Sequence, residues 1–351
     1  MIEKIKINNR LIGAGFTPFI IAEMSGNHNQ SLDRAFEIVK AAADAGVDAI
    51  KLQTYTADTI TFNGSNDEFK IKDENSLWNN QNLYELYKQA YTPWEWHKPI
   101  FDYANELGLI AFSSPFDESA VDFLETLNVP VYKIASFENT DHILLKKVAK
   151  TGKPVIMSTG VATISDIQES IQVLQTNGCK ELVLLKCTSP YPASPENTNV
   201  LTIPHMRELY DYPIGLSDHT MGIGASVAAI ALGACVIEKH FTLKRADGGV
   251  DSSFSLEPEE FKNLVIETER AFLSLGKVSY ELTEKEKKSL QFKRSLYVVK
   301  DIRAGEVITP AHIRSIRPGN GLHTRHYEDL IGKIIKVNVK AGTPVSFNMF
   351  K

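Results

Sequence analysis

Short apolar runs rich in β-branched residues recur along the first four-fifths of the chain, and most of them end in polar residues. There are eight: Phe19–Met24, Ala49–Gln53, Leu109–Ser113, Val131–Ala135, Val155–Ser158, Leu182–Cys187, Ile214–Ser217 and Val236–Phe241. Most are nearly continuous in hydrophobicity, which is typical of parallel strands covered on both faces. The pattern therefore predicts eight buried parallel strands.

Amphipathic helical stretches lie between most of these runs. Leu32–Ala45 stops before Gly46, Ile164–Gln175 is followed by Gly178, and Ser119–Leu127 is a further case. Glycine just beyond a helix is the usual C-terminal cap. Eight strands alternating with helices over about 250 residues indicate an α/β protein of the (β/α)8 TIM-barrel type. A doubly wound sheet is the competing interpretation, but it needs no eighth strand.

The pattern changes toward the C-terminus. The helix Pro258–Leu275 completes the barrel domain, residues 1–282, and the charged stretch Thr283–Lys288 indicates a linker over 283–290. Residues 291–351 consist of short strands with glycine turns, and 301–306 and 339–344 look like two related turn units. A module of about 60 residues is marginal on its own, so we expect it to pack on something else. At the other end, Met1–Ile12 is expected to form a hairpin that turns at Asn8-Asn9 and closes the barrel bottom.

The longest gap between strands runs from Tyr55 to about Leu107. It contains a polar stretch, 63–82, and then an aromatic-rich segment expected to be one helix, around Tyr84, Tyr87, Trp94 and Trp96. An insertion after a barrel strand lies on the face that carries active sites, so it is expected to shape substrate choice. The alternative is a solvated decoration.

Composition limits the partners. The 351 residues include 38 Lys and Arg against 43 Asp and Glu, a net charge of −5, so no global attraction to nucleic acid or anionic membranes is expected. The three cysteines are too few and too far apart for a disulfide framework or a CxxC zinc site, and are expected to be buried thiols. No apolar run reaches the roughly 20 residues of a membrane span, and no secretion signal is recognised. We therefore expect a cytoplasmic protein that binds any anionic ligand in a local basic pocket.

Polar side chains at the strand ends form the candidate active site, because barrel enzymes carry their catalytic residues there. Strand periodicity places Lys51 with Gln53 on one face, and likewise Ser217 with His219 and Glu238 with His240. His219 and His240 end neighbouring strands about 4.8 Å apart, so both imidazoles can bind one divalent cation. Two histidines with open positions suit Mn²⁺, Co²⁺, Fe²⁺ or Zn²⁺ as a Lewis acid, and local hydrogen bonding is the alternative.

The same strand ends can hold an anion. Lys51, Lys133 and the hydroxyls of Ser136, Ser158 and Ser217 are suitable partners for a phosphate or carboxylate. A strand-end lysine can equally be a Schiff-base nucleophile, or pair with Glu23 or Glu138. Glu138 follows a strand end, where it can transfer a proton or form a structural ion pair.

The ordered motifs resemble the sialic acid synthase family. They are Ile20-Ile21-Ala22-Glu23 with Asn27-His28, Ala49-Ile50-Lys51-Leu52-Gln53-Thr54, Phe112-Ser113-Ser114-Pro115-Phe116, Lys133-Ile134-Ala135-Ser136-Phe137-Glu138, Ser158-Thr159-Gly160, Cys187-Thr188-Ser189-Pro190-Tyr191-Pro192, Leu216-Ser217-Asp218-His219-Thr220 and Ile237-Glu238-Lys239-His240-Phe241. The last 60 residues, with Arg317-Pro318-Gly319-Asn320-Gly321-Leu322, resemble that family's antifreeze-like (SAF) domain. The resemblance covers essentially the whole chain.

The resemblance implies a transferase that condenses phosphoenolpyruvate with an N-acylated amino-sugar aldehyde to give a nonulosonic acid and phosphate. By similarity, phosphoenolpyruvate would be held by Lys51, Ser114, Lys133, Ser136, Ser158 and Ser217. The sugar would meet Gln53, Tyr191 and Asp251, with the carboxylates Glu23 and Glu138 near the reacting carbons. The metal, Mn²⁺, Co²⁺ or Mg²⁺, would be held by His219 and His240. Arg317 would come from the partner subunit of a domain-swapped homodimer.

Several positions favour one branch of this family. Sialic acid synthases usually have Thr at Ser114, Gly at Phe137, His at Lys186 and Asn at Ser189. In the insertion, Phe69-Lys70-Ile71, Ser76-Leu77-Trp78, Leu83-Tyr84-Glu85-Leu86-Tyr87 and Thr92-Pro93-Trp94-Glu95-Trp96-His97 resemble the long insertion of pseudaminic acid synthases. A larger apolar wall, formed by Phe137 and Trp78, suits a 6-deoxy, di-N-acetylated sugar. The product would enter a cell-surface polysaccharide or flagellin.

Three alternatives remain open. An N-acetylneuraminate or legionaminate synthase would use the same reaction. A phosphosugar-dependent synthase of the ketodeoxyoctulosonate type needs an extra phosphate site, for which the sequence has no spare basic cluster. A non-catalytic coat, interaction or ice-binding protein has no reason to keep Lys51, Gln53, Glu138, His219 and His240 together.

Overall fold

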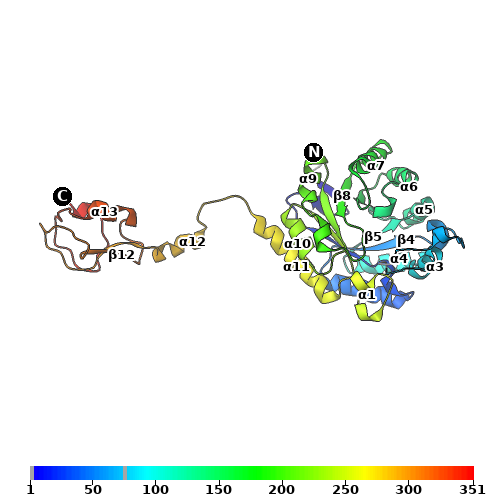
Figure 1. Cartoon of the computed structure of the whole chain (residues 1–351), viewed down its shortest axis with the longest axis horizontal. Helices are drawn as coiled ribbons and strands as arrows, with labels where there is room; N and C mark the ends of the chain where they lie inside the picture. The colour runs from blue at the N-terminus through cyan, green and yellow to red at the C-terminus, as the bar shows by residue number, and fades with distance from the viewer. Residues whose placement is uncertain (1–3, 74–76) are drawn as a thin grey trace. The chain divides into compact units, whose positions relative to one another are not determined.

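The computed structural model describes residues 4–73 and 77–351, and the chain divides into two compact units, Met1–Gly276 and Lys277–Lys351 (Figure 1). Each unit is described by itself. Residues 1–3 of the expected hairpin and Ser76 of the insertion lie outside the described residues. No helix among those described is long and apolar enough to cross a membrane.

The first unit is a closed parallel barrel of eight strands in the order β10-β3-β4-β5-β6-β7-β8-β9. Its strands are β3 (Phe19–Glu23), β4 (Ala49–Thr54), β5 (Ile110–Pro115), β6 (Tyr132–Ile134), β7 (Val155–Ser158), β8 (Leu182–Cys187), β9 (Ile214–Asp218) and β10 (Val236–His240). Closure between β10 and β3 excludes the open doubly wound sheet. The (β/α)8 prediction is confirmed.

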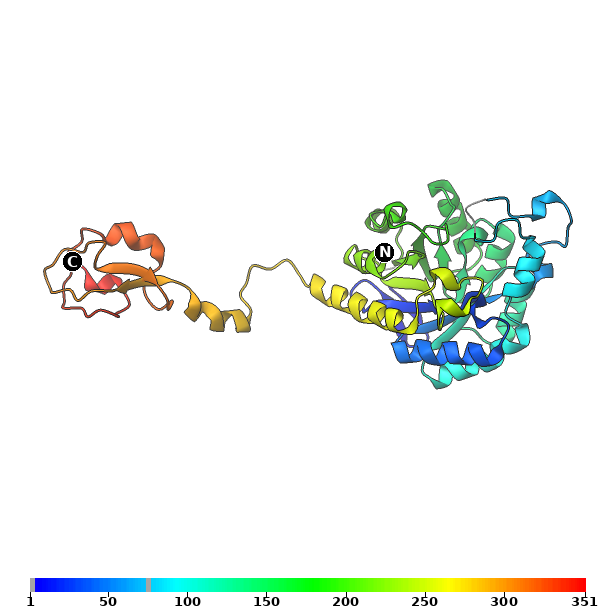
Figure 2. The ribbon, with the colours of Figure 1, turned by 60° about the horizontal axis from the view of Figure 1, so that its bottom comes forward.

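Helices surround the strands (Figure 2). They are α1 (Leu32–Ala45), α2 (Ala57–Ile60), α3 (Leu83–Ala90), α4 (Trp94–Glu106), α5 (Glu118–Thr126), α6 (His142–Ala149), α7 (Ile164–Thr176), α8 (Pro195–Thr198), α9 (Thr202–Leu209), α10 (Gly224–Ala231) and α11 (Pro258–Leu275). Helix α1 has the expected caps at both ends. The Ser31 side chain accepts a hydrogen bond from the Arg34 amide, and Gly46 ends the helix in the left-handed conformation at φ 84°. Its buried face includes Ala35, Ile38 and Val39, which pack in the layer between helices and strands.

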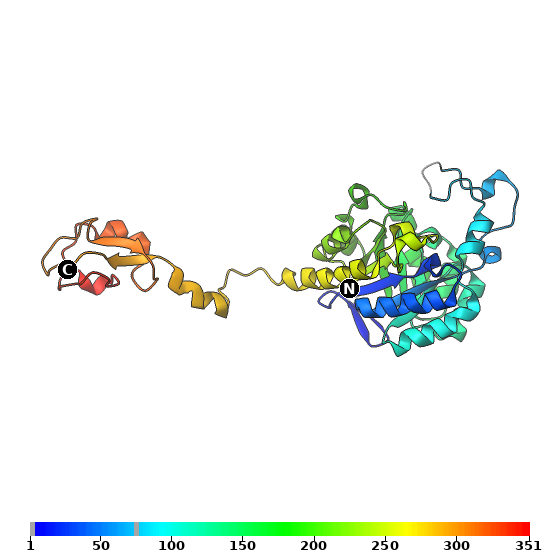
Figure 3. The same cartoon turned by 90° about the horizontal axis from the view of Figure 1, so that it is seen from below.

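A hairpin closes the lower end of the barrel. Strands β1 (Lys4–Ile7) and β2 (Arg10–Gly13) pair antiparallel, and Asn8 in the turn has φ 50° (Figure 3, dark blue). Ile5, Ile7 and Ile12 are buried in one cluster with the inward-facing side chains of the lower strand halves. The barrel interior is therefore filled with apolar side chains up to about its middle.

The insertion differs from the prediction of one aromatic helix. The structure has two helices, α3 and α4, which are separated at Tyr91–Pro93, with Pro93 as the N-terminal cap of α4. Proline disfavours a helical conformation at the residue before it, so the chain leaves the helix there. Lys70 and Asn82 form an isolated bridge that closes the polar stretch between them.

The second unit has a small core of its own. Strands β11 (Ser295–Val298) and β12 (Ile313–Ile316) pair antiparallel, and α13 (Tyr327–Leu330) lies in the following segment. The two turn units meet: Ile302 bridges Val339, and Asp301 accepts hydrogen bonds from the Lys340 ammonium and the Ala341 amide. The charged stretch predicted as a linker contains a short helix, α12 (Glu284–Ser289), whose first turn is capped by Thr283 and Glu286.

Candidate active site

Alternation along the strands decides which polar side chains face the barrel interior. The inner apolar cluster contains Phe19, Ile21, Val183, Leu185 and Val236. Because side chains alternate with period two, the residues two positions beyond such inner positions also face inward. The inward polar set at the upper strand ends is Glu23, Lys51, Gln53, Ser114, Lys133, Ser158, Cys187, Ser217, His219, Glu238 and His240.

Two buried lysines share one carboxylate. Glu238 lies between them, with its Oε2 3.2 Å from Lys51 Nζ and its Oε1 3.5 Å from Lys133 Nζ. Glu23 Oε2 is 2.5 Å from Lys51 Nζ. Burial lowers the pKa of Lys51 to about 7 although Glu238 opposes this shift. Of the two ion pairs expected for a strand-end lysine, the structure contains the one between Lys51 and Glu23, whereas Glu138 forms none among the described residues. The ion pairs with Glu238 were not expected.

Serine hydroxyls surround the lysines. Lys133 Nζ donates to Ser158 Oγ at 2.8 Å, and Lys51 Nζ donates to Ser114 Oγ at 3.4 Å. Ser217 Oγ donates to Glu238 at 3.2 Å. Two ammonium groups ringed by hydroxyl donors form a site suited to a phosphate or carboxylate, which accepts charge-assisted hydrogen bonds.

A glycine makes room beside these hydroxyls. A Cβ on Gly160 would lie 2.1 Å from Ser189 Oγ and 2.6 Å from Ser136 Oγ, far inside contact distance. The backbone after β7 therefore approaches the hydroxyls of two neighbouring strand-end loops. Ser136 is thus part of the same polar cluster, as the sequence motifs suggested, and Gly160 permits the close approach.

Glu138 is a buried carboxylate near the end of β6. It ends a short 3-10 turn, Ser136–Glu138, after β6, and its Oε2 is buried without a hydrogen-bond partner among the described residues. Burial raises the pKa of Glu138 from 4.5 to about 7, although Lys133 lowers it in part. A carboxyl group with such a pKa can accept and release a proton near neutral pH.

His219 and His240 lie side by side, with ring centroids 5.4 Å apart. His219 Nδ1 lies 2.9 Å from the Thr188 carbonyl, which leaves its Nε2 as the free ligating atom. His240 Nδ1 is buried and without a hydrogen-bond partner in the described part of the chain. Burial and the neighbouring cations hold the pKa of His240 well below its usual value, so its ring is neutral, the form that binds metals.

These observations fit a two-histidine metal site. No group of three or more His, Cys, Asp or Glu side chains that could hold a metal occurs among the described residues. A site of this kind would supply two nitrogen ligands and leave the other positions to water and substrate oxygen, as in catalytic sites with open positions.

Three of the four residues expected to bind the sugar, Gln53, Tyr191 and Asp251, belong to the barrel unit. The Tyr191 ring contacts His219 and Phe254 in tilted arrangements, with centroids 4.5 Å and 5.2 Å apart. Trp78 of the insertion reaches Tyr191 at 6.1 Å, and its Nε1 donates to the Val250 carbonyl at 3.3 Å.

The rim also contains polar and exposed groups. Asp251 accepts a hydrogen bond from Ser25, and burial raises the pKa of Asp251. Gln53 is half-buried, and Phe137 is 61% exposed. Arg317, the remaining residue expected at the sugar, follows β12 and belongs to the second unit.

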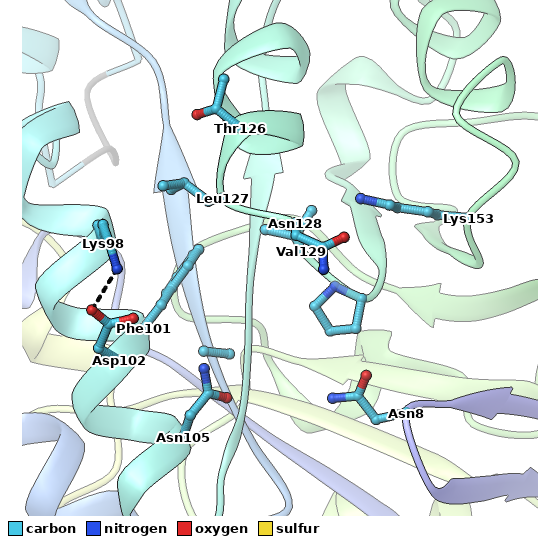
Figure 4. A pocket seen from close by; sticks show the side chains of 12 residues that line it. Asn8, Lys98, Phe101, Asp102, Asn105, Thr126, Leu127, Asn128, Val129 and Lys153 are labelled. Carbon is cyan, nitrogen blue, oxygen red and sulfur yellow. Dashed lines mark hydrogen bonds and ion pairs between the residues drawn. The ribbon is translucent and has the colours of Figure 1, made fainter.

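A cavity of about 470 Å³ lies elsewhere in the barrel unit (Figure 4). It is bounded by Asn8 of the hairpin, by α4 and by the loop before β6. Its charged groups are already paired, Lys98 with Asp102 and Lys153 with Glu125. This cavity is at the lower end of the barrel, away from the strand ends that form the candidate active site.

Two inward residues are missing from the site predicted from the sequence. The strand pattern indicates only that Glu238 shares a face with His240, and the cysteine count indicates only that Cys187 is a buried thiol. Cys187 Sγ lies 3.6 Å from Ser189 Oγ and 3.8 Å from His219 Nδ1. The alternation of inward and outward side chains along β8 could have placed Cys187 on the inner face, because Val183 and Leu185 face inward. No sequence signal identified Phe254 as a neighbour of His240.

Comparison with known proteins matches the NeuB family over residues 38–280 and the SAF domain over residues 293–351. The chain is 44% identical to the pseudaminic acid synthase of Campylobacter jejuni over 92% of this chain and 94% of that protein. It is 42% identical to the pseudaminic acid synthase of Helicobacter pylori, over 94% and 96%. The crystal structure of a sialic acid synthetase from Leptospira borgpetersenii in complex with citrate, 32% identical, matches with a TM-score of 0.73 over 82% of this chain and 95% of that chain.

The two family matches thus cover most of the barrel and the C-terminal module. The chain belongs to the NeuB family of sialic acid synthase-type enzymes and ends in a SAF domain.

Proposed function

We propose that this protein is a pseudaminic acid synthase. It condenses phosphoenolpyruvate with 2,4-diacetamido-2,4,6-trideoxy-L-altrose to give pseudaminic acid and phosphate. The observation that carries this proposal is the 44% identity to a pseudaminic acid synthase, which extends over 92% of the chain and both of its domains. The ring contact between Trp78 and Tyr191 supports it, because an apolar wall suits a sugar with a methyl group at C6.

Phosphoenolpyruvate binds through the buried cationic pair. Lys51 and Lys133, with the hydroxyls of Ser114, Ser136, Ser158 and Ser217, donate hydrogen bonds to its carboxylate and phosphate, which compete with Glu23 and Glu238 for the two lysines. Support comes from the hydrogen bonds that already orient both lysines, from Lys133 to Ser158 at 2.8 Å and from Lys51 to Ser114 at 3.4 Å. Groups that are oriented before the substrate arrives need no reorganisation during the reaction.

The C2–C3 π electrons of phosphoenolpyruvate form a bond from C3 to the aldehyde carbon of the open-chain sugar. The aldehyde C=O π bond breaks at the same time, and its oxygen takes up a proton to become a hydroxyl group. Positive charge then develops at C2, and water adds there. Glu138 accepts a proton from this water, which its pKa of about 7 permits at neutral pH. Cleavage of the C2–O bond then releases phosphate while the C2 hydroxyl loses its proton and becomes the ketone, so the bridging oxygen leaves with phosphorus. Gln53, Tyr191, Asp251 and Glu23 orient the sugar and the reacting carbons.

A divalent cation, Mn²⁺, Co²⁺ or Mg²⁺, belongs to this proposal as a cofactor held by His219 and His240. When bound, it supplies Lewis-acid polarisation of the aldehyde oxygen. The neutral, unpartnered His240 ring in the described part of the chain supports this role.

We also propose a domain-swapped homodimer in which the SAF domain of one subunit covers the barrel mouth of the other and brings Arg317 to the acyl group of the sugar. Apolar side chains are exposed on both proposed surfaces. On the barrel side they include Phe137 and Leu201, exposed to 61% and 73%, and on the SAF side Val337 and Phe347. Burial of such side chains favours association.

Phosphate release with phosphoenolpyruvate and each candidate aldehyde tests the substrate. We expect the trideoxy-altrose to react fastest; faster release with N-acetylmannosamine or with the legionaminate precursor would contradict the proposal. Phosphoenolpyruvate labelled with ¹⁸O at the bridging position should transfer its label to phosphate. Sedimentation of the full chain should give a dimer.

A further inference from the structure

A fully buried ion pair lies directly behind the two histidines. Asp218 Oδ2 and Lys239 Nζ are 3.0 Å apart, and both side chains have no exposed area. They are register partners on β9 and β10, on the outer faces of the strands. Each immediately precedes one of the histidines, Asp218 before His219 and Lys239 before His240. This ion pair thus links the two strands at the residues directly before His219 and His240.

The pair also fixes the segment that follows His219. Asp218 Oδ1 accepts hydrogen bonds from the Thr220 amide at 2.8 Å and the Thr220 hydroxyl at 2.7 Å. Its Oδ2 accepts from Ser226 Oγ at 2.7 Å, and Lys239 donates to the Thr220 carbonyl. The residues on both sides of His219 are therefore held by the same buried network.

Stability alone does not explain these charges. Two residues earlier on the same strands, the outward side chains are Leu216 and Ile237, which are fully buried in the apolar layer between strands and helices. Replacing a buried ion pair by apolar side chains is often neutral or stabilising, because desolvating two charges offsets their attraction. A role other than stability is therefore needed to explain the charged pair Asp218 and Lys239.

Orientation of His240 provides that role. Its Nδ1 has no hydrogen-bond partner among the described residues, whereas that of His219 lies 2.9 Å from a carbonyl oxygen. The His240 ring is thus placed chiefly by its backbone and by packing against Tyr191 and Phe254. The ion pair between the ends of β9 and β10 then determines the distance between the two imidazoles.

We propose that Asp218 and Lys239 are positioning residues that set the spacing of His219 and His240 and thereby the affinity of this pair for a divalent cation. The inference rests on the metal site of the proposed function. Groups that orient metal ligands without touching the metal typically change affinity by about ten- to a hundredfold when they are replaced.

The test measures Mn²⁺ binding to the full-length protein without substrates, by electron paramagnetic resonance of free Mn²⁺, together with the melting temperature. The variants are Asp218→Asn, Lys239→Met and their combination. Each single variant should raise the Mn²⁺ dissociation constant by about ten- to a hundredfold and lower the melting temperature. The double variant, which removes both charges, should recover melting temperature but not Mn²⁺ affinity.

Asp48→Asn is the matched control. Asp48 accepts hydrogen bonds from Arg10 Nε at 2.9 Å and from the Ile20 amide at 2.8 Å, at the opposite end of the barrel. It should lower the melting temperature and leave the Mn²⁺ dissociation constant unchanged. Wild-type affinity in the folded double variant, or a loss of affinity in Asp48→Asn equal to that in Lys239→Met, would overturn the positioning role alone. Absence of Mn²⁺ binding by the wild type would overturn the metal site and this inference with it.

Discussion

Replacing Glu138 by glutamine should change how stability depends on pH. Burial raises the pKa of Glu138 from 4.5 to about 7 in the folded protein. Between these two values the folded state keeps the proton and the unfolded state loses it, so the wild type loses stability as the pH rises through this window. Glutamine has no proton to lose. Glu138→Gln should therefore gain stability relative to the wild type as the pH rises from 4.5 to 7, with no further gain above that.

The size of this gain follows from the two pKa values. One pKa unit corresponds to about 1.4 kcal/mol, so the difference amounts to ~3 kcal/mol in the free energy of unfolding. For the barrel unit, Met1–Gly276, an unfolding entropy of roughly 2 cal/mol/K per residue means that 1 kcal/mol shifts the melting temperature by about 2 °C. The melting-temperature difference between variant and wild type should thus grow by roughly 6 °C between pH 4.5 and pH 8.

Thermal unfolding of both proteins across this pH range, without substrates, is the assay. Glu95→Gln, on the exposed side of α4, is the control and should track the wild type at every pH. In kinetics, the wild type should lose kcat/KM as the pH falls below about 7, whereas Glu138→Gln should lack this limb and lose about 10²–10⁴ in kcat. A melting-temperature difference that stays constant from pH 4.5 to 8 would refute the raised pKa of Glu138.

Four further predictions concern the rest of the site. EDTA, or the change His240→Ala, should abolish turnover and Mn²⁺ binding; full activity in either case would contradict the metal site. Arg317→Ala should raise the KM for the sugar without affecting phosphoenolpyruvate binding, and mixing it with a barrel-inactive variant should restore some activity if subunits share sites. Gly160→Ala should weaken phosphoenolpyruvate binding measured by calorimetry, because its Cβ would lie 2.1 Å from a serine hydroxyl; unchanged binding would argue against a rigid loop. Trp78→Ala should reduce the preference in kcat/KM for the 6-deoxy over the 6-hydroxy acceptor by about tenfold, since one methyl group in an apolar site contributes about 1–3 kcal/mol; an unchanged ratio would exclude Trp78 from the wall.

The strands were predictable because a short, continuous apolar run that ends in polar residues is typical of a buried parallel strand. Helix α1 was predicted to the residue, since Ser31 and Gly46 cap it by standard chemistry. Pro93 indicates the break between α3 and α4, but the aromatic residues on both sides of it favoured a single helix. The spacing of Thr283 and Glu286 indicates the start of α12, but the high charge of this stretch favoured a linker.

The site was only partly predictable, because its contacts depend on closure of the barrel. Period-two alternation places Lys51 and Glu238 on inner faces, yet they are far apart in sequence. They meet at 3.2 Å because β10 pairs with β3, which in turn pairs with β4. Similarly, Trp78 reaches the loop after β10 through a long insertion, and a local pattern contains no information on such a contact.

The hairpin beneath the barrel has a kinetic consequence. Ile5, Ile7 and Ile12 fill the lower end in the described part of the chain, so ligands of the proposed site are expected to enter and leave through the upper mouth. The lysines proposed for phosphoenolpyruvate are 3% and 1% exposed, whereas the sugar-binding residues Tyr191 and Asp251 are half-buried at the rim. A sugar bound at the rim would block the way to the lysines. Catalysis should therefore follow a compulsory order in which phosphoenolpyruvate binds first, and phosphate is released only after the nonulosonic acid has left.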